Sequence, residues 1–303
     1  MHILIVRNNS NRQAMEASLL LGLYLDNQGI DHTVCDLGGP DCSDRDERLC
    51  AVARQSALAV VLGGDGTMLK TSHLVGSATV PILGINFGHL GFLANPNDEG
   101  VVALVGQALV GELAEERRTN LAVTVVCEGQ RDPFEDGWGD GAPEAFASAQ
   151  GRCAPASFFA LNELAVTRGA NGRVIEVGLT IAGQPIDDVR GDGFVVASAT
   201  GSTAYALSAG GPVLAPLSKN LVAVPISPHS LRSRAIVTDP SDVVELDLSR
   251  NGEGRDATVF IDGDLLDLPS APRRIYVQRG DAPTVLLRSG SQRFYRHVSE
   301  VFF

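Results

Sequence analysis

Short apolar runs alternate with longer amphipathic stretches over the first third of the chain. Three of the runs are dense in Val, Ile and Leu, which is typical of strands buried on both faces: His2 to Val6, Ala57 to Leu62 and Pro81 to Ile85. A further short strand is expected near Asp31 to Cys35. Helical periodicity marks the stretches between them, at about 13–28, at about 45–55 and in a segment that begins near Met68. Alternating strands and helices predict a parallel sheet covered on both faces, so we expect a Rossmann-like α/β domain.

Beyond about Thr119 the pattern changes to β-rich segments. The expected strands are Leu121 to Cys127, Phe158 to Thr167, Ile175 to Ile181, Gly193 to Ala199, Val243 to Leu248 and Thr258 to Ile261. Short strands joined without helices predict a second, mostly antiparallel domain. We therefore expect an α/β domain over residues 1–119 and a β-rich domain over residues 120–280, with residues 281–303 packing back on the first.

One segment interrupts the β-rich half. Residues 128–157 are rich in Gly, Pro, Asp, Glu and Ala, a composition that favours an exposed loop over a packed element. The segment separates the first two expected strands of this half. We therefore interpret it as a loop insertion, and its role stays open.

The balance of charge narrows the possible partners. The chain has 36 acidic and 24 basic residues, which gives a formal net charge of −12. Nucleic acids and anionic lipids are bound through clusters of Lys and Arg, so neither a nucleic acid nor a membrane is an expected partner. An anionic substrate would have to be held mainly by backbone N–H groups, helix ends, metal ions and a few placed basic side chains.

Cysteine usage and the start of the chain indicate a compartment. The five cysteines are an odd number and include no C-x-x-C pair, so neither a disulfide framework nor a zinc site is predicted. Met1 is followed directly by a strand-like run, without the basic and apolar regions of an export signal. We expect a cytoplasmic protein.

The strongest local motif is the sequence GGDGT, at residues 63–67. It follows the apolar run that ends at Leu62 and opens the next helical segment. Glycines allow backbone N–H groups to approach phosphate oxygens, and the N-terminus of a helix attracts negative charge. The phosphate-binding candidates are Gly63, Gly64, Gly66 and Thr67. The motif is neither a Walker A loop nor a G-x-G-x-x-G fingerprint.

Asp65 is the unusual member of this loop. A carboxylate beside phosphates is repulsive unless it binds the accompanying metal ion or accepts a proton from the attacking hydroxyl. The alternative is structural: Gly63 and Gly64 make a tight turn, and Asp65 caps the helix. The residues alone leave these alternatives open.

GGDGT is shared by a kinase superfamily that includes NAD kinases, diacylglycerol and sphingosine kinases and, more distantly, 6-phosphofructokinases. The motifs that follow it here are GINFGHLGFL at 84–93, Asn162-Glu163, Gly191-Asp192-Gly193, TGSTAYALSAGGP at 200–212, PISPHSL at 225–231 and Ile261-Asp262-Gly263. In this order and at these separations the chain resembles the NAD kinase family from about residue 3 to residue 265.

The resemblance implies an enzyme that phosphorylates the 2′-hydroxyl of the adenosine ribose of NAD to give NADP. It implies ATP as the donor, with polyphosphate left open, Mg²⁺ or another divalent cation as cofactor, and a homodimer or homotetramer whose partner subunit completes the site. Asp65 would be catalytic, orienting or deprotonating the hydroxyl. The residues implied to bind NAD are Asp65, Gly66, Asn162, Glu163, Arg190, Asp192, Thr200, Thr203, Ala204, Tyr205 and Ser208. No residue is assigned as a metal ligand.

The residue types at these positions suit a dinucleotide. A carboxylate such as Glu163 can accept hydrogen bonds from both hydroxyls of a ribose diol, and the amide of Asn162 can pair with a base edge. Small hydroxyl residues around Tyr205 supply short donors and acceptors beside an aromatic face. Alternatives are a lipid kinase of the diacylglycerol type, which would lack these motifs, and a non-catalytic dinucleotide sensor, which need not keep Asp65.

Two departures from the family pattern affect the fine specificity. Where many members read Thr-Pro before TGSTAY, this chain has Ser198-Ala199. Where DGQ is frequent, it has Asp262-Gly263-Asp264, a change that we expect to alter cation or charge handling. Neither change touches Asp65 or the Asn162-Glu163 pair.

Overall fold

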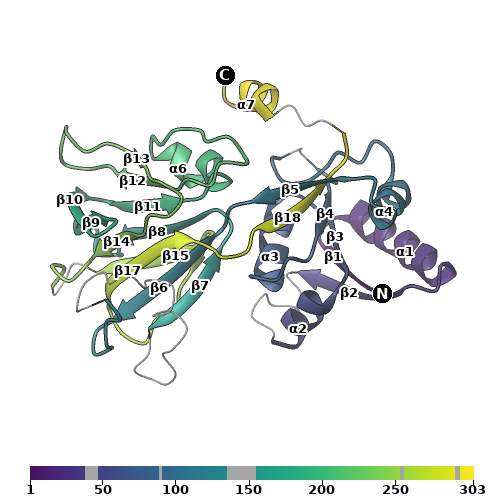
Figure 1. Ribbon diagram of the computed structural model, residues 1–303, viewed down its shortest axis with the longest axis horizontal. Helices are drawn as coiled ribbons and strands as arrows, with labels where there is room; N and C mark the ends of the chain where they lie inside the picture. Colours follow the sequence, from purple (N-terminus) through teal and green to yellow (C-terminus); the bar gives the residue numbers. More distant parts are fainter. Residues whose placement is uncertain (38–46, 89–90, 135–154, 253–255, 291–293) are drawn as a thin grey trace. The chain divides into compact units, whose positions relative to one another are not determined.

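The computed structural model describes residues 1–37, 47–88, 91–134, 155–252, 256–290 and 294–303. These residues divide into two compact units (Figure 1). The first unit comprises Met1–Arg118 and Ala282–Phe303, and the second comprises Thr119–Asp281. Most of the predicted insertion, residues 135–154, lies outside the described residues.

The first unit is built on a six-stranded sheet with the order β2-β1-β3-β4-β18-β5. Its strands are β1 (His2–Asn8), β2 (Asp31–Leu37), β3 (Leu58–Leu62), β4 (Ile82–Ile85), β5 (Ala114–Arg118) and β18 (Thr284–Arg288). Every pairing is parallel except that of β18 with β5. All residues of β3 and β4 are buried, as a central parallel strand covered on both faces requires.

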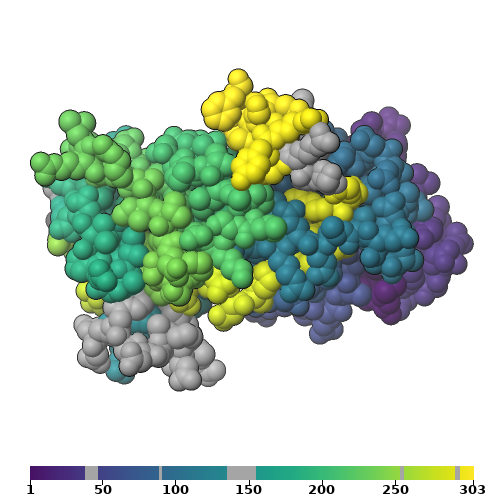
Figure 2. Space-filling model, turned by 45° about the horizontal axis from the view of Figure 1, so that its top comes forward, coloured from purple at the N-terminus to yellow at the C-terminus, as the bar shows by residue number. Residues whose placement is uncertain are grey.

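Helices cover both faces of this sheet. They are α1 (Arg12–Asn27), α2 (Glu47–Gln55), α3 (Asp65–Val75) and α4 (Val101–Leu109). The Asn11 side chain caps α1 by accepting the N–H of Ala14. α1 and α4 lie side by side and share a core with β1 and β3, whereas α2 packs beside α3. The C-terminal helix α7 (Phe294–Phe302) lies at the surface (yellow in Figure 2). Its Tyr295 is largely exposed.

The second unit contains two six-stranded sheets with antiparallel pairings, in the orders β10-β9-β14-β17-β6-β7 and β13-β12-β11-β8-β15-β16. The strands are β6 (Leu121–Cys127), β7 (Ala156–Ala160), β8 (Glu163–Arg168), β9 (Ile175–Ile181), β10 (Gln184–Gly191), β11 (Gly193–Ala197), β12 (Val222–Ile226), β13 (Ile236–Val237), β14 (Val244–Asp247), β15 (Ala257–Ile261), β16 (Asp264–Leu265) and β17 (Pro272–Arg279).

A single apolar core joins the two sheets of the second unit. It combines inward residues of the sheet that contains β6 and β9, such as Val123 and Val177, with inward residues of the sheet that contains β8 and β11, such as Val166 and Phe194. β9 shows the strict alternation of buried and partly exposed residues that a strand with one buried face requires. The opposite face of the second sheet packs against Ala206, which belongs to the short helix α6 (Tyr205–Ser208).

The expected fold class is confirmed: an α/β unit with a largely parallel sheet and a β-rich, antiparallel unit. The expectation of one strand over Phe158 to Thr167 is wrong. The segment breaks at Leu161 and Asn162, so that β7 and β8 belong to different sheets. The Asp262 carboxylate accepts the backbone N–H groups of residues 161–163, and these bonds replace ladder bonds at the break. Among the described residues, no helix combines the length and apolarity needed to cross a membrane.

Candidate active site

The GGDGT loop joins β3 to α3 in the first unit. Gly64 occupies the N-cap of α3 and has no side chain with which to cap the first turn. A Cβ at Gly63 would lie 2.5 Å from Oγ1 of Thr67, whereas Gly66 is exposed and has open space at its Cβ position. The loop therefore presents an uncapped helix N-terminus, the feature that binds phosphate groups in other proteins.

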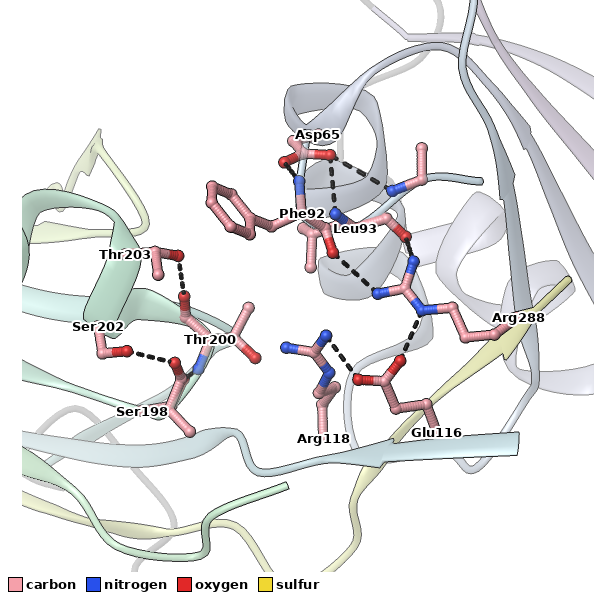
Figure 3. Close-up of polar contacts among 12 residues, drawn as sticks. Asp65, Phe92, Leu93, Glu116, Arg118, Ser198, Thr200, Ser202, Thr203 and Arg288 are labelled. Atoms are coloured by element: carbon pink, nitrogen blue, oxygen red, sulfur yellow. Dashed lines mark hydrogen bonds and ion pairs between the residues drawn. The ribbon is translucent and has the colours of Figure 1, made fainter. Parts of the chain in front are cut away.

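Asp65 is the first residue of α3, but its carboxylate does not cap the helix. Its Oδ2 accepts the backbone N–H of Phe92 at 2.7 Å, and its Oδ1 accepts those of Leu93 at 3.0 Å and Ala94 at 3.4 Å (Figure 3). Three consecutive N–H groups form a concave nest for an anion. The capping alternative is therefore wrong, because Asp65 is oriented by a segment 27 to 29 residues away.

The position of the carboxylate depends on a glycine. A Cβ at Gly91 would lie 2.2 Å from Oδ2 of Asp65 and 2.3 Å from its Cγ, so only glycine leaves room there. An ionised carboxylate offers about four lone-pair positions. The three N–H groups use one on Oδ2 and two on Oδ1, which leaves a position on Oδ2 for a hydroxyl proton.

The Asn162-Glu163 pair lies in the second unit, at the break between β7 and β8. The Asp262 carboxylate holds this break through Leu161, Asn162 and Glu163, at 2.7, 2.8 and 2.9 Å. Asp262 and Gly263 both have positive φ, 51° and 88°, and form the two-residue turn between β15 and β16. Since Asp tolerates this conformation and bonds locally, the turn aims its carboxylate at the break.

The segment that contains TGSTAY lies directly against this pair. A Cβ at Gly201 would lie 2.2 Å from the carbonyl oxygen of Asn162, so the two backbones are in close contact. The buried Ser198 hydroxyl donates to Leu161 O at 2.6 Å and accepts the N–H groups of Thr200 and Gly201. The Ser198 hydroxyl thus ties the two motifs together.

Several predicted nucleotide-binding residues gather on this segment. Thr200 is buried and accepts the Thr203 hydroxyl through its carbonyl at 3.2 Å, whereas Tyr205 is 38% exposed and Ser208 is exposed. Ala204 is half-buried and precedes α6. The structure therefore brings Asn162, Glu163 and the segment from Thr200 to Ser208 together within one unit.

Two polar atoms at this place are buried without a hydrogen-bond partner among the described residues. They are Oδ1 of Asn162 and Oε2 of Glu163. Burial, together with the charge of Asp262, raises the pKa of Glu163 to about 8, against the opposing effect of the Tyr205 backbone N–H. At neutral pH the Glu163 carboxyl is therefore largely protonated. It can donate one hydrogen bond as well as accept others.

This raised pKa predicts how stability depends on pH. In the unfolded chain Glu163 ionises near 4.5, whereas in the folded protein it stays neutral up to about 8. Its contribution to stability is therefore complete below pH 4.5 and is lost as the pH rises through about 8. Glu163→Gln lacks the titrating group and therefore does not lose this stability. Between pH 5 and pH 8 its free energy of unfolding should rise by a few kcal/mol relative to that of the wild type, because one pKa unit corresponds to about 1.4 kcal/mol. Urea unfolding at pH 5, 6, 7 and 8 measures the difference, and parallel curves for the two proteins would contradict it.

The structure does not bring Arg190 and Asp192 close to the Asn162-Glu163 pair. Asp192 lies between β10 and β11 and pairs with Arg168 at 3.2 Å, and the carbonyl of Arg190 accepts the N–H of His229 at 2.7 Å. Along β11, Gly193 pairs with Thr167 and Ala197 with Glu163. Asp192 and Glu163 are thus at opposite ends of a five-residue strand, roughly 15 Å apart at about 3.3 Å per residue.

Several residues that position the site were not predicted as site residues. Asp262 and Ser198 lie in motifs that the sequence makes visible, but their roles depend on contacts across 37 to 101 residues. Arg288, Glu116 and Arg118 form a chain of charged groups beside residues 92–94, in which both arginines are buried and Glu116 is partly buried. No sequence signal marks these three, because each has the appearance of an ordinary charged residue of a strand.

No protein metal centre is evident in the described part of the chain. Within it, no group of three or more His, Cys, Asp and Glu side chains is placed to hold a metal ion. We therefore assign no residue as a metal ligand here and derive no step through a metal ion held by the protein.

Comparison with known proteins assigns the family. The model of the ATP-NAD kinase N-terminal domain matches residues 4–112, and that of the ATP-NAD kinase C-terminal domain matches residues 161–289. The chain is 30% identical over 305 residues to the NAD kinase of Heliobacterium modesticaldum, and the alignment covers 98% of this chain and 96% of that protein. It is 34% identical over 284 residues to the NAD kinase of Laribacter hongkongensis, which covers 91% and 87%.

Solved structures share the fold. The yeast NADH kinase complexed with NADH has a TM-score of 0.79 at 20% identity, and the match covers 99% of this chain and 87% of that one. The NAD kinase of Archaeoglobus fulgidus in complex with ATP has a TM-score of 0.69 at 22% identity, and the match covers 99% and 98%. With both family domains matched and relatives aligned over nearly its whole length, the chain belongs to the NAD kinase family.

Proposed function

We propose that this protein transfers the terminal phosphoryl group of ATP to the 2′-hydroxyl of the adenosine ribose of NAD and releases NADP. One observation carries the assignment of the acceptor. Oδ1 of Asn162 and Oε2 of Glu163 are buried beside the TGSTAY segment without a partner among the described residues. Buried polar atoms are costly unless they are bonded, and a nucleoside supplies the missing partners through its base edge and ribose hydroxyls.

The TGSTAY segment supports an adenosine in this position. Tyr205 offers an exposed aromatic ring for stacking, while Thr200 and Thr203 carry hydroxyl groups on either side of Gly201, whose backbone contacts Asn162. Glu163, protonated at neutral pH, can donate to one ribose oxygen and accept from the neighbouring hydroxyl. The NAD-binding residues that we assign within this unit are therefore Asn162, Glu163, Thr200, Thr203, Ala204, Tyr205 and Ser208.

Asp65 is the residue that we assign to the proton transfer. The lone-pair position left on its Oδ2 can accept the proton of the attacking hydroxyl as the bond to the phosphorus forms. The three N–H groups hold the carboxylate in one orientation, so little reorganisation is needed during the reaction.

The donor is assigned to the GGDGT loop. The uncapped first turn of α3, with Gly64 and Gly66, suits the phosphates of ATP. A divalent cation enters as part of the donor, in the Mg–ATP form, and neutralises charge on the triphosphate. This division suits a chain whose net charge of −12 provides little positive charge of its own.

The test is direct. Purified protein is incubated with NAD, ATP and Mg²⁺, and NADP is quantified with an NADP-specific dehydrogenase. We expect NADP to accumulate in proportion to enzyme and time, and diacylglycerol to remain unphosphorylated under the same conditions. NAD binding without NADP formation would overturn the proposal and favour the sensor alternative.

We also propose that the working enzyme is a homo-oligomer. Asp192 is remote from Glu163 within one chain, whereas the family resemblance assigns both to NAD. Both assignments hold if Asp192 and Arg190 reach the site from a second subunit. The cytoplasm is the compartment that we assign, because NAD and ATP are available there.

This arrangement predicts complementation between inactive subunits. Asp65→Asn and Asp192→Ala proteins should each lose most of their turnover as homo-oligomers. Co-expressed subunits should recover activity, since a mixed dimer contains one site with both carboxylates intact. The mixture is purified through two different affinity tags, and NADP formation is measured. Activity no higher than that of the separate variants would contradict a site shared between subunits.

A further inference from the structure

A largely buried chain of charged groups lies beside residues 92–94, the segment whose N–H groups bind Asp65. Arg288, at the end of β18, is 4% exposed and binds Glu116 through Nε at 2.6 Å. Glu116 also binds Arg118 at 2.6 Å, and Arg118 is 3% exposed. Burial alone would raise the pKa of Glu116, but the charges of Arg118 and Arg288 outweigh it and lower the pKa. Burial, only partly offset by Glu116, lowers the pKa of Arg118 to about 10, so its guanidinium is charged at neutral pH.

The other two arms of Arg288 reach main-chain carbonyls. One terminal nitrogen donates to Phe92 O at 2.8 Å and the other donates to Leu93 O. The peptide unit that contains Phe92 O also contains the N–H of Leu93, and the unit that contains Leu93 O also contains the N–H of Ala94. Both of those N–H groups donate to Oδ1 of Asp65.

Two consecutive peptide units thus bridge Arg288 and Asp65 (Figure 3). In each of these peptide groups the carbonyl oxygen faces the guanidinium of Arg288 and the N–H faces the carboxylate of Asp65. The peptide dipole is therefore aligned favourably with both charges. Hydrogen bonds arranged in such a chain polarise and strengthen one another. The planar fork of an arginine matches two neighbouring carbonyls and a carboxylate at once, which the point charge of a lysine cannot do.

Other contacts fix the same segment without carrying charge. The buried side chain of Asn95 donates to Gly84 O and Leu287 O, both at 2.9 Å, and ties the segment to β4 and β18. The Phe92 ring packs against His297 and Phe302 of α7, with centroids 4.6 and 5.8 Å apart. These contacts place the segment, while Arg288 is the group that orients its carbonyls.

From this geometry we propose that Arg288 is a positioning residue for phosphoryl transfer, acting on Asp65 through the Phe92–Leu93 and Leu93–Ala94 peptide units. The inference rests on the proposed function, because it takes Asp65 as the group that receives the hydroxyl proton. Arg288 itself touches neither substrate. Its guanidinium binds the carbonyl oxygens of the two peptide groups whose N–H groups bind the Asp65 carboxylate.

The test uses Arg288→Lys in the full-length protein, with Arg7→Lys as the matched control. Arg7 is also a partly buried arginine of this sheet that binds a carboxylate, Asp36, but it belongs to β1 and contacts another part of the unit. We expect kcat to fall at least 10-fold in Arg288→Lys, with the KM values for NAD and ATP changed less than 3-fold. Arg7→Lys should keep the wild-type kcat.

A double-mutant cycle separates positioning from loss of stability. In an Asp65→Asn background the carboxylate is absent, so Arg288→Lys should lower the remaining kcat less than 3-fold. If Arg288 had only a structural role, the separate losses of kcat in the two single variants would multiply in the double variant, and that result would overturn the inference. An unchanged kcat in Arg288→Lys alone would overturn it as well.

A second measurement does not depend on turnover. Amide hydrogen exchange at Leu93 and Ala94, followed by NMR, should accelerate at least 10-fold in Arg288→Lys and stay unchanged in Arg7→Lys. Unchanged exchange in Arg288→Lys would overturn the inference whatever the activity. Absence of NADP formation by the wild type, with the exchange result as expected, would instead count against the proposed function alone.

Discussion

Asp65→Asn should lower kcat by about 10² to 10⁴, the range expected when a general base is removed. The structure adds a second reason for a large effect. Three N–H groups converge on the two carboxylate oxygens, so an amide in this place would point its own NH₂ group at one of them. The variant therefore loses the proton acceptor and leaves a donor facing a donor.

Single-turnover NADP formation at saturating NAD and ATP measures this effect. Isothermal titration with NAD should give a dissociation constant within about 3-fold of the wild-type value, because the adenosine contacts assigned in the second unit are intact. Turnover within 10-fold of the wild type would refute the assignment of Asp65 as the base.

Gly91→Ala should impair turnover almost as strongly, although residue 91 is not assigned to either substrate. The added methyl group would lie 2.2 Å from Oδ2 and 2.5 Å from Oδ1 of Asp65, a carboxylate that three backbone N–H groups hold in place. Either the carboxylate or the 92–94 segment must move. A displacement of about 1 Å in a catalytic group can cost about 10² in rate, so we expect a fall in kcat of that order.

Gly106→Ala is the matched control for this substitution. Gly106 belongs to α4 of the same unit, and its new Cβ would make only an ordinary contact, 3.7 Å from the Tyr24 hydroxyl. That variant should keep the wild-type kcat and gain up to about 1 kcal/mol from better helix propensity. Equal kcat values for Gly91→Ala and the wild type would show that the 92–94 segment does not fix Asp65.

Much of the first unit was predictable because its pattern is local. The apolar runs at 57–62 and 81–85 correspond to β3 and β4, and strand-glycine-helix spacing placed GGDGT at the start of a helix. In the second unit Ile175–Ile181 was predicted to the residue, because a strand with one buried face alternates strictly. The strand β10 was missed, because five consecutive residues from Gln184 to Asp188 are exposed and provide no apolar signal.

The sequence by itself determined the family and the residue types that the chemistry needs. GGDGT, Asn162-Glu163 and TGSTAY each consist of neighbours along the chain, so their order and spacing can be read without coordinates. The break inside the Phe158 to Thr167 run was decided only by the tertiary structure. Its cause is the Asp262 carboxylate, which comes from a hairpin about 100 residues later.

Asp65 shows the same division most clearly. Sequence identified it as the unusual acid of a phosphate loop, but left a helix cap, a metal ligand and a proton acceptor as alternatives. Only the fold brings the Phe92–Ala94 amides and the guanidinium of Arg288 around it, from β18 and from the segment after β4. Hydrogen bonds between residues so far apart leave no periodicity in the sequence, because they depend on which strands become neighbours in the sheet.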